Sequence, residues 1–306
     1  MNMGEMNMDQ QSREKSDPVA LHRQNAARLG PRDVVIAAYP GSGASLISNI
    51  LIELGFDHVD PYSEVIAEDG RCDVLQEDLA YRSRLSAMAA LDRKIRSTGT
   101  RPEGQLRFVK NHLHPRFFSP EGLAGAVLLV RDPRDTLHSC YHWYHSFSAD
   151  RLAQAKGQGT FAEFLDGIAL NGEPPVEGWC HFNRAWADAL EGFPRSAVIR
   201  FEDLKTDPEA TTARLVEAFG FERSPESIAR ATRNSRYENM RAHEEKSLGA
   251  GATDRPLVMR RGKVEEWREW WGNAGLAAPF HEPRLVETAD RFGYQVTRSD
   301  DSTPGH

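Results

Sequence analysis

The segment that decides the fold reads Asp33-Val34-Val35-Ile36-Ala37-Ala38-Tyr39-Pro40-Gly41-Ser42-Gly43-Ala44-Ser45. After Asp33 it runs through apolar residues as far as Tyr39, which predicts a buried parallel strand. A glycine-rich turn follows, and residues 46–54 have the spacing of a helix. Exposed amides at the start of such a helix, together with its dipole, favour a bound anion. We therefore predict a phosphate-binding turn between a strand and a helix.

This turn does not match the loop that binds nucleoside triphosphates. The pattern G-x-x-x-x-G-K-[ST] would place its first glycine at Ala38 and its lysine at Ala44, so that only Gly43 and Ser45 agree. The sequence therefore disfavours an ATPase or GTPase. The prediction of a phosphate cradle is unaffected, because the cradle needs only the turn and the helix start.

A second informative stretch is Val130-Arg131-Asp132-Pro133-Arg134-Asp135-Thr136-Leu137-His138-Ser139, which follows the apolar run 125–129. We expect a strand that leads into a helix beginning at Pro133, because proline lacks the N–H that would be unsatisfied at a first helical position. Arg131 at the end of the strand and Ser139 on the helix can then converge on one anion.

Together these stretches resemble the sulfotransferases that take a sulfuryl group from 3′-phosphoadenosine 5′-phosphosulfate (PAPS). The family's donor loop, Tyr-Pro-Lys-Ser-Gly-Thr-Thr-Trp, is similar to residues 39–46, and its 3′-phosphate motif is similar to residues 131–135 with Ser139. Four further family segments have counterparts in the same order: Lys110-Asn111-His112-Leu113, residues 201–208, residues 236–240 and residues 260–268. The six motifs span the chain from about Asp33 to Trp271.

The resemblance implies an α/β, P-loop-like fold with a mostly parallel central sheet and helices on both faces. It implies an enzyme that transfers the sulfuryl group of PAPS to a hydroxyl, less readily an amine, of a small-molecule acceptor. The product of the donor is adenosine 3′,5′-bisphosphate (PAP), and no metal is required.

The Lys-Asn-His-Leu segment supplies the two residues that we assign to catalysis. His112 follows a predicted strand end, where parallel α/β sheets place their chemistry, and its ordinary pKa of roughly 6.5 suits a general base. Lys110 is expected to contact the sulfuryl group. The alternatives are a hydrogen-bonded structural histidine and an exposed lysine at the end of a strand.

The remaining motifs imply the residues that bind the donor. The loop Gly41, Ser42, Gly43, Ala44 and Ser45 would hold the sulfuryl group and the 5′-phosphate. Arg131, Ser139, Arg260 and Arg261 would hold the 3′-phosphate, and Gly262 would let the backbone approach it. For Tyr237 we keep two interpretations open, stacking on adenine and packing as an ordinary aromatic residue.

Three positions depart from the family pattern. Gly41 stands where the family has the loop lysine, Leu46 where it has a tryptophan that stacks on adenine, and Phe201 where it has a tyrosine. Sulfuryl transfer requires stabilisation of charge on the leaving phosphate, much as phosphoryl transfer does. We therefore expect the stabilising charge of the missing lysine to come from Lys110 and the loop amides, with a further arginine as an open alternative.

Composition and charge fit an intracellular enzyme. The formal net charge of −7 argues against nucleic acid as a partner, and the 3 cysteines, Cys72, Cys140 and Cys180, have no paired spacing. We see neither a signal peptide nor a membrane span, so we expect a cytoplasmic protein. The predicted organisation is a disordered or loosely attached arm over 1–25, a single domain over 26–298 and a flexible tail over 299–306. Whether the chain forms a homodimer stays open.

A histidine cluster and one long segment each have two interpretations. His138, His142 and His145 share one helix face, but no nearby acidic ligand completes a zinc site, so we prefer a packing helix. Residues 62–104 have a mostly helical pattern and could close over the acceptor or pack on the core. Two alternatives to the sulfotransferase remain open: a nucleotide-dependent phosphotransferase on the same fold and a non-catalytic relative that binds PAP.

Overall fold

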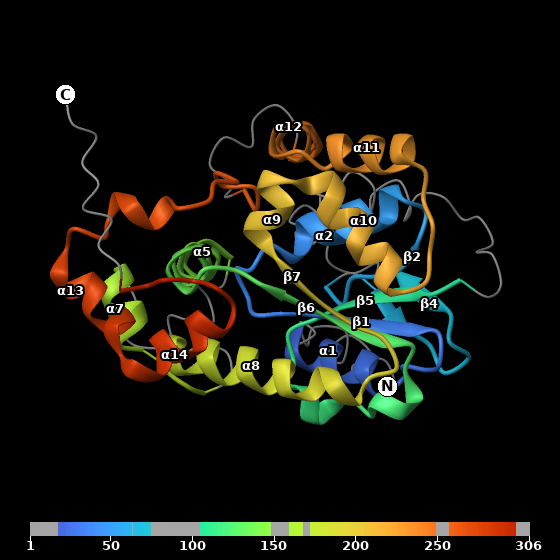
Figure 1. Cartoon of the computed structure of the whole chain (residues 1–306), viewed down its shortest axis with the longest axis horizontal. Helices are drawn as coiled ribbons and strands as arrows, with labels where there is room; N and C mark the ends of the chain where they lie inside the picture. Colours follow the sequence, from blue (N-terminus) through green and yellow to red (C-terminus); the bar gives the residue numbers. More distant parts are fainter. Residues whose placement is uncertain are drawn as a thin grey trace, which may run out of the picture.

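Five parallel strands form the central sheet of the computed structural model, which describes residues 18–62, 64–74, 105–147, 159–167, 172–248 and 257–297. Their order is β2-β5-β1-β6-β7, and every neighbouring pair is parallel. The strands are β2 (Asp57–Val59), β5 (Arg107–Asn111), β1 (Asp33–Ala38), β6 (Gly125–Val130) and β7 (Ser196–Arg200). The mostly parallel α/β sheet predicted from the sequence is confirmed (Figure 1).

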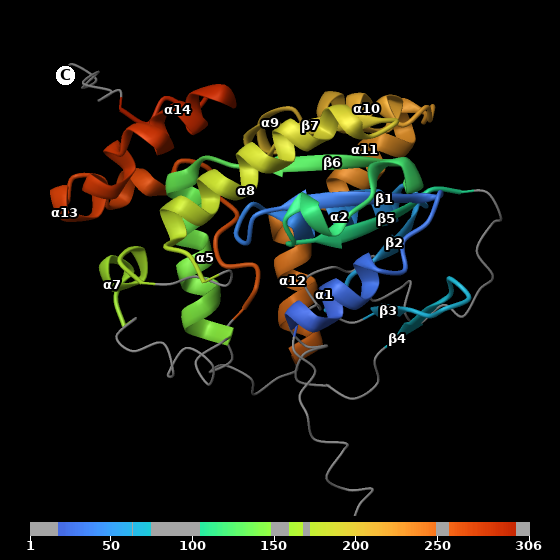
Figure 2. The same ribbon diagram turned by 90° about the horizontal axis from the view of Figure 1, so that it is seen from below.

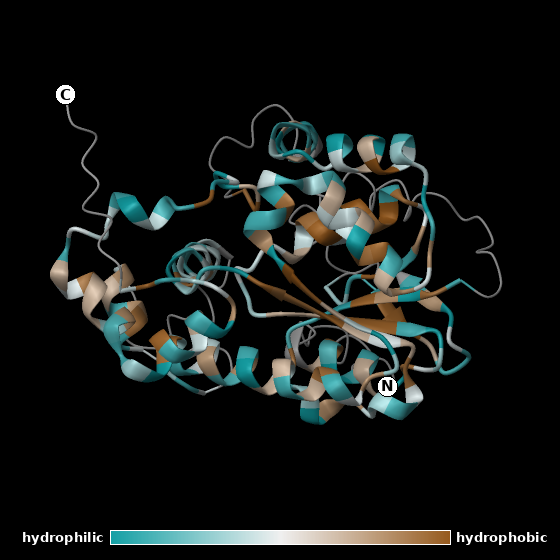
Figure 3. Ribbon diagram, viewed as in Figure 1, coloured by the Kyte–Doolittle hydropathy of each residue, from teal (hydrophilic) through white to brown (hydrophobic). Residues whose placement is uncertain are grey.

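Helices cover both faces of this sheet, so β1 is buried on both sides. Val35 and Ala37 contribute to a core with α5 (Pro133–Phe147), α8 (Pro175–Ala189) and α14 (Pro283–Arg291). The alternate residues of β1, among them Ile36, contribute to a second core with α2 (Ala44–Glu53), α10 (Pro208–Ala218) and α11 (Pro225–Asn234). Figure 3 shows the resulting apolar strands between helices whose outer faces are polar. This double burial explains the continuous apolar run of β1.

The remaining elements lie around this sandwich. A two-stranded antiparallel hairpin, β3 (Glu64–Ile66) with β4 (Cys72–Val74), forms at the start of the segment for which a helical pattern was predicted. That prediction is wrong for the hairpin, and residues 75–104 lie outside the described part of the chain. Figure 2 shows the hairpin beside α1 (Pro18–Ala26), while α7 (Phe161–Leu165) and α13 (Ala274–Ala277) lie together at the far end of the molecule. The described residues also form α9 (Phe201–Thr206) and α12 (Tyr237–Leu248).

Helix α1 corrects the boundary of the loosely attached arm. Residues 18–25 belong to this helix, in which Leu21, His22 and Asn25 are buried. The Asn25 side chain donates to the Glu64 carbonyl at 2.9 Å and accepts from the Ile66 amide at 2.7 Å, which ties α1 to β3. Residues 1–17 and the predicted tail lie outside the described residues, and the single domain over 26–298 stays a prediction. Among the residues that are described, no helix has the length and apolar character to cross a bilayer.

A buried ion pair joins β1 to β5 at the start of both strands. Asp33 and Arg107 are register partners, and the guanidinium donates from Nε to Oδ1 at 2.6 Å and from a terminal nitrogen to Oδ2 at 2.8 Å. The exposed fractions are 0% for Asp33 and 2% for Arg107. A third donation goes to the Gly70 carbonyl at 2.6 Å, so the same side chain also anchors the hairpin turn.

Replacing Asp33 by Ala should lower the free energy of unfolding by about 3–5 kcal/mol, because it leaves the Arg107 cation buried without its partner. Urea unfolding followed by circular dichroism measures the change. The exposed pair Arg71–Asp69 is the control, since screening by water leaves little to lose there, and Asp69→Ala should have a far smaller effect. Equal effects of the two substitutions would contradict this account of the β1–β5 pairing.

Candidate active site

The turn after β1 is closely packed between two other elements. Gly41 and Gly43 both have φ of 93°, in the left-handed region that favours glycine. A Cβ atom at Gly41 would overlap the carbonyl oxygen of Thr136 and lie 3.0 Å from the amide nitrogen of Cys140, both on α5. A Cβ atom at Gly43 would overlap the Phe201 ring. Glycine at both positions is therefore a steric requirement of the turn, and position 41 has no room for a lysine side chain.

The start of α2 has the features of an anion site. Gly43 is the N-cap residue, so no side chain caps the helix, and its first amides are left for a ligand. Ser42 is 1% exposed, and its hydroxyl has no hydrogen-bond partner within the described part of the chain. Ala44 is buried and Ser45 half-buried beside it. A buried hydroxyl without a partner, beside uncapped amides, fits a phosphate or sulfuryl group.

Arg131 connects three parts of the site. Its guanidinium donates to the carbonyls of Gly41 and Lys263, each at 3.0 Å, and lies 3.5 Å from the Asp135 carboxylate. It also stacks over the Phe201 ring, with its central carbon 4.5 Å from the ring centroid. Its buried Nε has no partner within the described residues, so the group keeps a donor for a ligand.

Helix α5 begins at Pro133, as predicted, and its first turn holds the C-terminal loop through Asp135. That carboxylate accepts from the amides of Glu265 and Trp267, at 2.8 and 2.9 Å. Burial raises the pKa of Asp135 to about 6, although Arg131 and the two amides oppose the rise. Ser139 is half-buried one turn further along.

In the C-terminal loop, the two arginines that the sequence analysis assigns to the 3′-phosphate already have carboxylate partners. Arg260 forms a two-point ion pair with Glu266, and Arg261 pairs with Glu269 at 2.5 Å and with Glu266 at 3.3 Å. The two predicted phosphate ligands are thus neutralised by carboxylates of their own loop. A bound 3′-phosphate would have to compete with the buried carboxylate of Glu266, which is 4% exposed.

Tyr237 anchors this loop. Its hydroxyl donates to the Arg260 carbonyl at 2.9 Å, and a Cβ atom at Gly262 (φ of 62°) would overlap its ring. Gly262 therefore permits a close approach of the backbone, as expected, but the group that the backbone approaches in this structure is the Tyr237 ring. Stacking of Tyr237 on adenine stays a prediction.

Lys110 and His112 come to the carboxyl end of β5 together, as the sequence predicted for strand-end residues. The Lys110 ammonium lies 3.1 Å from an oxygen of Asp60 and 4.7 Å from the centroid of the Tyr62 ring. It is 6% exposed, which excludes the alternative of an exposed strand-end lysine. Asp60 and Tyr62 were not identified from the sequence.

His112 has a defined tautomer. Its Nδ1 lies 2.7 Å from the Ala38 carbonyl oxygen, which can only accept, so Nδ1 carries the proton and Nε2 of the neutral ring is an acceptor. Burial, followed by the charges of His22 and Lys110, lowers the pKa of His112 to about 3. The imidazole is therefore neutral near pH 7. Rings of His22 and Tyr62 lie beside it, at centroid distances of 5.3 and 5.9 Å.

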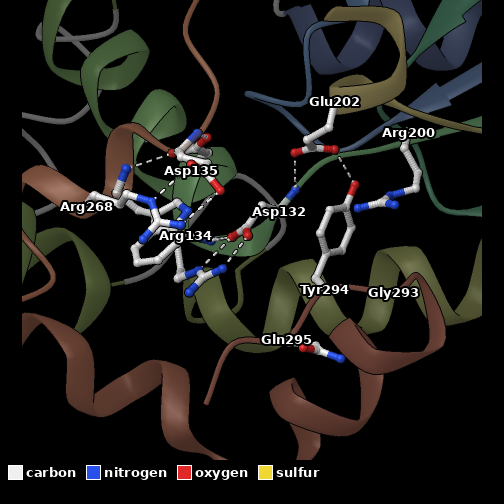
Figure 4. A pocket seen from close by; sticks show the side chains of 11 residues that line it. Asp132, Arg134, Asp135, Arg200, Glu202, Arg268, Gly293, Tyr294 and Gln295 are labelled. Carbon is white, nitrogen blue, oxygen red and sulfur yellow. Dashed lines mark hydrogen bonds and ion pairs between the residues drawn. The ribbon is translucent and has the colours of Figure 1, made fainter. Parts of the chain in front are cut away.

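A polar cavity of about 230 Å³ lies behind the 131–135 motif. Figure 4 shows Glu202 at its rim, where the carboxylate accepts from the Asp132 amide at 3.0 Å and from the Tyr294 hydroxyl at 2.6 Å. Arg134 forms an ion pair with Asp132. Its guanidinium also stacks on Trp267, with the central carbon 3.5 Å from the ring centroid. These contacts join the motif to the C-terminal segment.

The histidines of α5 do not gather a metal site in the described residues, where no group of three His, Cys, Asp or Glu side chains is placed to hold an ion. His138 and His142 face one another, with their Nε2 atoms 3.2 Å apart, and His138 Nδ1 lies 3.8 Å from Glu266. Burial, the largest cause in each case, lowers the pKa of both rings to about 4. The two histidines therefore lie beside the C-terminal loop.

Comparisons with known proteins agree with this geometry. Sulfotransferase 2A1 of Rattus norvegicus is 25% identical over 248 residues, which cover 77% of this chain and 78% of that protein. Sulfotransferase 1E1 of Homo sapiens is 23% identical over 285 residues, covering 89% and 90%.

Two solved structures share the fold. Mouse sulfotransferase SULT7A1 complexed with PAP gives a TM-score of 0.57 at 18% identity, covering 88% of this chain and 89% of that one. Retinol dehydratase in complex with androsterone and PAP gives 0.55 at 21% identity, covering 92% and 85%. The family model described as the sulfotransferase domain matches residues 31–272. A match over that much of its length means that this chain belongs to the sulfotransferase domain family.

Proposed function

We propose that this sulfotransferase moves a sulfuryl group from PAPS to a hydroxyl of a small-molecule acceptor, with His112 as the general base. The observation that carries the proposal is the hydrogen bond between His112 Nδ1 and the Ala38 carbonyl, which makes Nε2 of the neutral ring an acceptor, on a residue that follows β5 beside the strand that leads into the anion-binding turn. The mouse sulfotransferase and retinol dehydratase structures contain PAP, and the latter also contains androsterone. These ligands support the donor and the small-molecule class of acceptor.

The donor site fits the anionic groups of PAPS. The turn 41–45 would receive the sulfuryl and 5′-phosphate groups, because the Ser42 hydroxyl has no hydrogen-bond partner among the described residues and no side chain caps the start of α2. Arg131 and Ser139 would receive the 3′-phosphate. Arg260 and Arg261 would join them after exchanging Glu266 for the phosphate, since both side chains lie in the loop that Arg131 contacts.

PAPS supplies an activated sulfuryl group, whose sulfur bonds to the acceptor oxygen as its bond to the phosphate oxygen breaks. His112 takes the hydroxyl proton on Nε2, while its Nδ1–H remains bonded to Ala38. Negative charge near the ring favours its protonated form, so a bound anion raises the pKa of His112 and strengthens the base. Lys110 offers positive charge where the leaving phosphate develops negative charge.

A non-catalytic relative that binds PAP is the second candidate. It is favoured by the packing at Gly41, which removes the family's loop lysine, and by the internal ion pairs of Arg260 and Arg261. A phosphotransferase has less support, because the turn lacks the lysine of triphosphate-binding loops.

PAP should raise the melting temperature of the protein, because it binds only the folded state. At a hundredfold excess over Kd the gain is roughly 2.7 kcal/mol. ATP should shift it far less, since it has no 3′-phosphate for Arg131 and Ser139. Differential scanning fluorimetry with both nucleotides measures this. Equal shifts would contradict the assignment of PAPS as donor.

Replacing His112 by Ala should lower kcat by about two to four decades, the usual contribution of a positioned base, and leave the Kd of PAP nearly unchanged. Because His112 has a pKa of about 3 in the protein without ligand, kcat/KM of the wild type for PAPS should not fall as the pH drops through 6.5. Steady-state assays from pH 5 to 8 test both points. A variant within a few-fold of wild type would make His112 structural.

Gly41→Lys should weaken PAP binding and should not raise kcat, because any side chain at position 41 meets the backbone of α5. Lys110→Ala should reduce kcat by about 10²–10³, the usual loss for a donor that acts on developing charge. Calorimetry with PAP and PAPS turnover assays give the two quantities. If Lys110→Ala leaves kcat unchanged and Gly41→Lys raises it, the results would favour the hypothesis that the natural protein binds PAP without catalysing transfer.

A further inference from the structure

We propose that Asp60 is a positioning residue for sulfuryl transfer, holding the Lys110 ammonium at the strand ends beside His112. The inference rests on the proposed function, because it gives Lys110 its role on the leaving phosphate. Asp60 directly follows β2, the edge strand that pairs with β5, so the carboxylate and the lysine come from neighbouring strands.

The pair is buried and direct. Lys110 Nζ lies 3.1 Å from Asp60 Oδ2, and the side chains are 7% and 0% exposed. Burial acts to raise the pKa of Asp60, but the charges of Lys110 and then His58 outweigh it, so its pKa lies below the usual range. The carboxylate is therefore ionised and holds the cation by charge as well as by a hydrogen bond.

The carboxylate is itself held in one orientation. Its Oδ1 accepts from the Tyr62 amide at 3.0 Å, and the Asp60 amide donates to Glu64 at 2.9 Å. The Tyr62 ring lies against the ammonium on one side, at 4.7 Å. An ammonium has three N–H donors, and within the described residues Asp60 accepts the only hydrogen bond from Lys110. Two donors are left for a ligand.

Stability alone gives little reason for such a pair. Removing two charges from water costs so much that a buried ion pair is often no better than apolar side chains of similar size. A fixed cation has a use at this place, because the backbone of α5 excludes a lysine from position 41. In the family, a lysine of the donor loop supplies this charge. Here Lys110 on β5 supplies it, and Asp60 at the end of β2 fixes the position of its ammonium.

Other charged or titratable groups also surround the pair. The neighbours of Asp60 and Lys110 are His22 on α1, His58 on β2 and His112 directly after β5. Tyr62 precedes β3, and Glu64 is its first residue. Only Asp60 forms a direct ion pair with Lys110 in the described part of the chain. A substitution of Asp60 therefore changes the partner of the lysine and leaves the other groups in place.

The test compares Asp60→Asn with Asp57→Asn. Asp57 is a matched control, since it is a buried aspartate on β2, the strand that Asp60 follows, and its ion pair is with Arg32, at 3.7 Å. Two reactions are followed: sulfation of 4-nitrophenol as a probe acceptor, and hydrolysis of PAPS to PAP and sulfate, which needs no acceptor. Asp60→Asn should lower both rates on the order of 10²-fold, as misplacement of a catalytic group by an ångström does. The Kd of PAP should change far less than kcat.

A double-mutant cycle distinguishes an effect of Asp60 that acts through Lys110 from a general loss of structure. Asp60→Asn should add no further loss in a Lys110→Met background, because the lysine through which Asp60 acts is gone. Asp60→Glu should recover part of the activity, and Asp57→Asn should keep it. If Asp60→Asn does not fold, Asp60→Leu with Lys110→Met removes both charges and should match Lys110→Met alone.

Two kinds of failure are distinguishable. Wild-type protein that neither binds PAP nor consumes PAPS would overturn the proposed function. Wild-type protein that consumes PAPS, with Asp60→Asn equally or more active, would overturn the positioning role alone. Additive losses in the cycle, or a Lys110→Met variant with wild-type activity, would also overturn that role.

Discussion

The close contact between the Gly41 turn and the first turns of α5 is the constraint on which the site depends. No side chain fits at Gly41, because a Cβ atom there would overlap the Thr136 carbonyl. Arg131 closes the same contact by donating to the Gly41 carbonyl, and it reaches the C-terminal loop through Lys263. The donor turn, the motif after β6 and the C-terminal loop are thus fixed relative to one another. The loss of a loop lysine follows from this packing.

Much of the fold could be predicted because strands buried on both faces have continuous apolar sequences. Residues 33–38 and 125–130 were found in this way, and Pro133 marked the start of α5. The edge strand β2 was missed, since Asp57-His58-Val59 is short and mostly polar. Asp60 was missed with it, because only its place at a strand end distinguishes it.

The site was predictable in its residue types but not in their partners. His112 and Lys110 lie together, as their motif implies, and the Ala38 carbonyl that fixes the tautomer comes from a strand far away in the sequence. The pairing of Arg260 with Glu266 could not be predicted, because the spacing of charges along a loop does not determine which of them meet. An arginine that is paired within its own loop has fewer N–H donors left for a phosphate. In the proposed function, donor affinity therefore depends on this pairing.

The central claim is that this site catalyses sulfuryl transfer although Gly41 stands in place of the loop lysine. The most direct measurement is the rate at which the purified protein forms PAP from PAPS with a panel of hydroxyl acceptors, compared with the rate without protein. The account predicts acceptor-dependent formation of PAP over many turnovers. Tight binding of PAP without any formation of PAP above the background rate, across the whole panel, would contradict it.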